Sequence, residues 1–102
     1  MMVRFLAAAR EEFDGAVEYY DQQPVGLGQE LTDELDAVIE RIVSDPTSYE
    51  QMEPGIFRLS TQRFPCFPYS VIYVVRSDSV LVVAFQHAKR RPGYWKRRLH
   101  QI

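Results

Sequence analysis

The spacing of apolar residues changes halfway along the chain, and this change constrains the fold more than any other feature. Over residues 9–20 and again over 27–42, apolar side chains recur every three or four positions, the period of one helix face. Residues 70–75 and 80–85 are instead rich in β-branched and aromatic side chains, and the four residues between them predict an antiparallel hairpin. Two helices followed by strands predict an α+β domain in which the helices pack on a sheet.

Proline and glycine mark the ends of these elements. Pro24 and Gly26 interrupt the helical pattern, so two helices with a short link are expected to form an antiparallel hairpin. Pro46 ends the second helix, because the residue before a proline disfavours the helical region. Phe57 and Leu59 alternate with polar neighbours and predict one more strand.

The remaining segments are short. Residues 3–6 are a possible strand and residues 47–55 are expected to be a loop. Residues 63–68 contain two prolines and predict a turn or an edge segment, while 94–101 could make one or two helical turns. The whole predicts a single domain over residues 1–102, with an N-terminal helical hairpin packed on a small antiparallel sheet and a short C-terminal helical tail.

Composition excludes several classes of protein. No apolar run approaches the roughly 18 residues of a membrane span, and the charges at 10–12 follow the N-terminus too soon for a signal peptide. Cys66 is the single cysteine, so no disulfide framework is expected and a cytoplasmic protein is the simplest interpretation. The pI near 5.6 argues against direct specific DNA binding by this chain alone. The two histidines are far apart in the sequence, so no metal site is expected. The chain has no glycine-rich phosphate loop, so no cofactor is expected either.

Charge is divided between the two halves of the chain. Residues 1–55 hold 13 of the 14 acidic residues and three of the 12 basic ones, whereas residues 56–102 hold nine basic residues and one acid. The acidic side chains on the helices are interpreted as solvated helix surfaces. The basic half is therefore the place to look for a binding site.

The segment from 87 to 95 combines His87, three cations at 89–91, Tyr94 and Trp95, and three further cations follow at 96–98. Such a cluster can bind an anion or a partner chain. Alternatively, the two rings form a lid over the sheet edge. His87 could act as an acid–base group, but no nucleophile or carboxylate stands at a recognisable spacing, so a structural hydrogen bond is favoured.

Arg58 and Arg63 are two further candidates. The neighbours of Arg58 in its strand are apolar, so its own side chain should point away from the core. Each arginine could bind a carboxylate or phosphate through paired donors, or could pair with an acid of the same chain. Both alternatives remain open from the sequence.

Several short motifs occur together, in an order that resembles a known family. They are Tyr19-Tyr20, Gly26-Leu27-Gly28, Phe57-Arg58, Arg63-Phe64-Pro65, Phe67-Pro68-Tyr69 and His87-x-x-Arg90-x-Pro92-x-Tyr94-Trp95. Over nearly its whole length the chain resembles RelE/ParE-type toxins of type II toxin–antitoxin modules. This resemblance implies a helical hairpin on a curved antiparallel sheet and neutralisation by a cognate antitoxin.

The family includes two activities. RelE-like members cleave messenger RNA on the ribosome, which would make Arg58, His87, Arg90 and Tyr94 the catalytic set here. ParE-like members inhibit DNA gyrase without catalysis of their own. Ser70 follows Tyr69 where RelE proteins carry an arginine, and metal-free RNA cleavage depends on preorganised cations to stabilise the transition state.

The favoured hypothesis is therefore a ParE-like toxin. Its target-binding or antitoxin-binding residues would be Arg58, Arg63, Arg90, Arg91, Tyr94 and Trp95. The alternatives are a RelE-like ribosome-dependent endonuclease and an inactive family member that serves only as an antitoxin partner.

Overall fold

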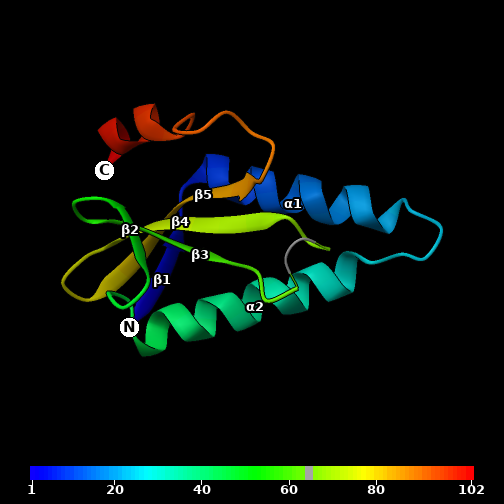
Figure 1. The fold of residues 1–102 in the computed structure, drawn as a ribbon, viewed down its shortest axis with the longest axis horizontal. Coiled ribbons are helices and arrows are strands. Elements are labelled where there is room, and N and C mark those ends of the chain that lie inside the picture. Colours follow the sequence, from blue (N-terminus) through cyan, green and yellow to red (C-terminus); the bar gives the residue numbers. More distant parts are fainter. Residues whose placement is uncertain (64–65) are drawn as a thin grey trace.

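The computed structural model describes residues 1–63 and 66–102, and Figure 1 shows the arrangement of its helices and strands. In chain order they are β1 (Met2–Phe5), α1 (Ala7–Asp21), α2 (Gly28–Ser44), β2 (Glu50–Glu53), β3 (Ile56–Ser60), β4 (Tyr69–Val75), β5 (Ser79–His87) and the 3-10 helix η1 (Lys96–Gln101). The predicted α+β class, the two helices and the β4–β5 hairpin are confirmed.

The sheet corrects the predicted fold. Its strand order is β1-β5-β4-β3-β2, and β1 runs parallel to β5, so the five-stranded sheet is mixed and the prediction of an antiparallel sheet is wrong. The possible strand over residues 3–6 is confirmed as β1, which belongs to this sheet and precedes the helical hairpin. Val3 pairs with Val80, and a pattern of four residues can predict a strand but cannot reveal a distant partner or its direction.

A second correction concerns residues 47–55, which were expected to be a loop. Strand β2 lies within them and pairs antiparallel with β3 through a turn at Gly55, whose φ is +81°. Its residues are mostly exposed and lack apolar alternation. Strand β2 therefore forms because the edge of β3 offers backbone groups for hydrogen bonding. No local sequence pattern predicts it.

Helices α1 and α2 cover one face of the sheet. Their buried stripes contain Ala9, Phe13, Ala16, Leu31, Leu35, Val38 and Ile42. These side chains pack on alternate strand residues such as Phe57, Tyr73 and Val82. The predicted helix faces are thus confirmed as the main core.

The link between the helices depends on a close approach. The Gly28 backbone N–H donates to Asp21 Oδ1 at 3.0 Å. A Cβ at position 28 would collide with that carboxylate, so the contact requires glycine. The hydrogen bond fixes the start of α2 against the end of α1.

The other face of the sheet is covered by the C-terminal tail, which turns back from β5 (Figure 1). Trp95 is 1% exposed and packs in a second core with Ile72 and Val83. The register between β4 and β5 shifts after Ile72, which pairs with Ala84, while Tyr73 pairs with Val82. This bulge leaves Val83 as an extra residue, so that it and Ala84 both join the second core.

Among the described residues, no helix is both long enough and apolar enough to cross a membrane.

Candidate functional site

The carboxylate of Glu12, on α1, is the centre of a hydrogen-bonded cluster that holds the C-terminal tail. The Tyr94 hydroxyl donates to it at 2.5 Å, and the two terminal nitrogens of Arg98 donate at 2.8 and 3.0 Å. The Phe85 backbone N–H adds a fourth bond at 3.1 Å. The side chains of Glu12 and Arg98 are only 14% and 15% exposed. The tail is therefore joined to both α1 and β5 at one point.

Glu12 was not singled out by the sequence, because the acidic residues of the helices were interpreted as solvated. That interpretation is wrong for this residue. The available signal was its spacing, three residues after Ala9 and four before Ala16, which places it along the edge of the buried stripe. A carboxylate at such a place is carried to the edge of the core and needs partners there.

Two arginines lie against the ring of Tyr94. The guanidinium carbons of Arg90 and Arg98 are 3.8 and 5.1 Å from the ring centroid, distances typical of cation–π contacts. Burial raises the pKa of the Tyr94 hydroxyl, and its hydrogen bond to Glu12 raises that pKa further. The hydroxyl therefore stays protonated at neutral pH and remains a donor to the carboxylate.

The basic residues of the tail surround a hollow of about 430 Å³. Its charged lining consists of Arg90, Arg91, Arg97 and Arg98, a set we call the arginine hollow. Within the described parts of the chain, Glu12 is the one carboxylate within 4 Å of any of the four, and it contacts Arg90 at 3.8 Å and Arg98 at 2.8 Å. Arg91 and Arg97 are exposed, so the hollow presents a surplus of positive charge.

Arg58 and Arg63 lie outside the arginine hollow. Arg58 donates from two nitrogens to Glu50 Oε1 on the neighbouring strand β2, at 3.1 and 2.6 Å. Arg63 pairs with Glu30 on α2 at 3.7 Å and lies over the Phe67 ring. The structure therefore supports the second alternative for Arg58 and Arg63, in which each pairs with an acid of the same chain.

The face of Arg58 carries a second hollow of about 300 Å³. Its other lining residues are Ser60, Ser70, Gln86 and Ala88. The Ser60 and Ser70 hydroxyls lie 2.9 Å apart and are hydrogen-bonded to each other. This face therefore offers neutral polar groups and one arginine that is already paired.

His87 and Trp95 have structural surroundings. His87 Nδ1 accepts a hydrogen bond from the Lys89 backbone N–H at 3.0 Å, and its ring packs edge-on against Tyr69. This bond supports the interpretation that His87 shapes the turn into the tail. Trp95 is buried in the second core, so its ring covers the sheet. For Trp95, this supports the alternative in which the ring forms a lid and is not a binding contact.

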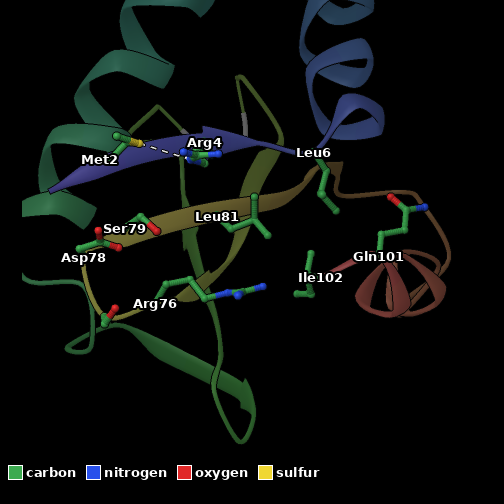
Figure 2. Close-up of a pocket in the computed structure, with 10 residues that line it drawn as sticks. Met2, Arg4, Leu6, Arg76, Asp78, Ser79, Leu81, Gln101 and Ile102 are labelled. Carbon is green, nitrogen blue, oxygen red and sulfur yellow. Dashed lines mark hydrogen bonds between the residues drawn. The ribbon is translucent and has the colours of Figure 1, made fainter.

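A larger hollow, of about 630 Å³, lies elsewhere, between the β1 edge, the β4–β5 turn and the end of the tail (Figure 2). Arg4, Arg76 and Asp78 are its charged residues, and Arg4 Nε donates to the Met2 sulfur at 3.3 Å. None of the residues singled out from the sequence lines it. Over residues 1–63 and 66–102, no group of three or more potential metal ligands comes together.

Comparison with known proteins decides the family. The model of the ParE toxin of the type II toxin–antitoxin system, parDE, matches residues 3–92. The chain belongs to the ParE toxin family. This confirms the resemblance to RelE/ParE-type toxins and its ParE-like character. A search of curated proteins found no match.

Solved structures support the fold of this ParE-family chain. The chromosomal ParDE system from P. aeruginosa gives a TM-score of 0.62 at 15% identity, covering 87% of this chain and 97% of that one. An arginine-substituted E. coli toxin RelE in complex with an antitoxin RelBc peptide gives 0.51 at 15% identity, covering 94% and 92%. At these identities the likeness establishes the fold alone.

Proposed function

We propose that this ParE-family toxin acts in the cytoplasm, arrests growth by inhibiting a protein target such as DNA gyrase, and is neutralised by a cognate antitoxin. The observation that carries the proposal is the arginine hollow, which four arginines line while Glu12 pairs with only two of them, Arg90 and Arg98. Clustered arginines with a neighbouring aromatic ring are typical of surfaces that bind acidic protein segments. Arg91 and Arg97 are the residues most free to make such contacts.

The chemistry of the sheet face argues against RNA cleavage. A metal-free nuclease must stabilise a crowded anionic phosphorane, for which preorganised cations are the main means. Ser60, Ser70 and Gln86 are neutral, and Arg58 is held by Glu50. Of the other residues of a possible catalytic set, Tyr94 and His87 are engaged in hydrogen bonds within the chain, and Arg90 pairs with Glu12 at 3.8 Å.

A supercoiling assay tests the proposal. The purified chain should inhibit gyrase-dependent supercoiling, and Arg91→Ala combined with Arg97→Ala should weaken that inhibition because two exposed charge anchors are lost. Arg76→Ala is the matched control, since Arg76 is equally exposed but lines a different hollow. Unaffected supercoiling at a large molar excess of wild-type protein would contradict a gyrase target.

Two further observations separate the alternatives. New messenger RNA ends within translated codons, mapped by primer extension after induction, would indicate the RelE-like activity instead. Normal colony growth after strong induction without antitoxin would indicate an inactive member that serves only as an antitoxin partner.

A further inference from the structure

Gly15 occupies an exposed position in the middle of α1, although nothing in residues 1–63 or 66–102 comes close enough to require a glycine there. An added Cβ would meet no atom within 4 Å. Glycine inside a helix is destabilising relative to alanine, because it loses more backbone freedom on folding. The usual structural reason for a helix glycine, close approach of another part of the same chain, is absent among the described residues. A close approach from outside the chain would also favour a glycine at this position.

Gly15 lies at the edge of a hollow of about 260 Å³, which we call the Gly15 groove. Tyr69 and Phe85 form its floor, with their rings stacked at 4.5 Å between centroids and almost wholly buried. Tyr19, one turn along α1, is 58% exposed and forms part of its wall. An aromatic floor with an exposed aromatic wall is suited to a large apolar side chain.

The rim of the groove is basic. His87 and Arg90 line it, and Lys89 and Arg91 adjoin them in sequence. Glu12, its one acidic lining residue, is already bonded to Tyr94 and Arg98. An occupant with a carboxylate next to its apolar side chain would therefore match the groove in shape and in charge.

We propose, building on the toxin function above, that the Gly15 groove receives a large apolar side chain from an acidic segment of the cognate antitoxin. Tight complexes depend on a few anchors that fill well-packed pockets, and a toxin kept inactive needs a tight complex. The missing Cβ at position 15 lets the antitoxin backbone lie close to α1. The groove adjoins the arginine hollow through Arg90, which lines both, so one segment could cover the two surfaces together.

The test uses the full chain and the antitoxin from the adjacent gene, with affinity measured by titration calorimetry. Gly15→Leu, which fills the groove, should weaken binding by about 30-fold or more, the effect of losing a main anchor. Gly15→Ala adds the Cβ alone and should weaken binding by a smaller factor than Gly15→Leu, because it hinders the close backbone approach but leaves the groove open. Glu11→Leu places the same leucine at another exposed position of α1 and should bind normally. Circular dichroism establishes that all three variants are folded.

Four results would overturn the inference. If Gly15→Leu binds the antitoxin as tightly as wild type and Glu11→Leu do, the groove is not the anchor site, whether or not the toxin function holds. If Gly15→Leu keeps its antitoxin affinity but loses inhibition of the target, the target is the occupant. If the wild-type chain dimerises in size-exclusion chromatography and Gly15→Leu does not, the occupant is a second copy of the chain. If wild type forms no complex with its neighbour, antitoxin neutralisation fails and this inference fails with it.

Discussion

Replacing Glu12 tests the cluster that joins the C-terminal tail to α1. Glu12→Ala would leave the Arg98 guanidinium, 15% exposed, without its carboxylate, and would also remove the acceptor of the Tyr94 hydroxyl and the Phe85 N–H. Removing one partner of a buried ion pair typically costs about 3–5 kcal/mol. Because the pair is slightly exposed, we expect a loss near the lower end, about 3 kcal/mol.

Glu12→Gln keeps the shape and one acceptor oxygen but loses the charge. Hydrogen bonds to charged groups contribute about 1.5–3 kcal/mol, so the loss should be intermediate, about 2 kcal/mol. Urea denaturation followed by circular dichroism measures both values. For a domain of this size, 1 kcal/mol corresponds to about 4–8 °C in Tm, so Glu12→Ala should lower Tm by roughly 12–24 °C.

Glu11→Ala is the control, because Glu11 is the exposed neighbour on the same helix. A double-mutant cycle with Arg98→Met should give a coupling energy of about 1–3 kcal/mol, since removing both charges avoids leaving one unpaired. A loss below about 0.5 kcal/mol for Glu12→Ala, similar to an ordinary surface change, would refute the reasoning. So would a coupling energy of zero.

Three further predictions concern stability. Burial raises the pKa of Tyr73 to about 12, so the unfolded chain releases this proton at lower pH than the folded chain. The stability contributed by the buried, protonated hydroxyl is present below about pH 10 and should fall as pH rises from 10 to 12. Tyr73→Phe should flatten that fall in urea titrations at several pH values. Gly15→Ala should raise the free energy of unfolding by about 0.5–1 kcal/mol, and an unchanged or lower denaturation midpoint would show that glycine is needed by the fold itself. Trp95→Ala should cost about 3–5 kcal/mol in the same assay, because the ring fills the second core; a loss below 1 kcal/mol would mean that the tail is not docked in solution.

The sequence was sufficient for features that depend on neighbouring residues. The three-and-four spacing over α1 and α2 predicted both buried faces, since a helix carries such residues on one side whatever it packs against. The β-branched runs and the short link predicted the β4–β5 hairpin in the same way. The basic cluster at the end of the chain and the family resemblance were also visible in the sequence, and the family match confirms the resemblance.

The tertiary structure decided the features that join distant residues. The parallel pairing of β1 with β5, the strand β2 within an expected loop, and the pairing of Arg58 with Glu50 all depend on which groups meet after folding. The bond between Glu12 and Arg98 spans 86 positions, and nothing near either residue specifies its partner. Periodicity records which side of an element faces the core, because that depends on local geometry. The choice of a hydrogen-bond or charge partner depends on the packed chain as a whole, so it became visible only with the fold.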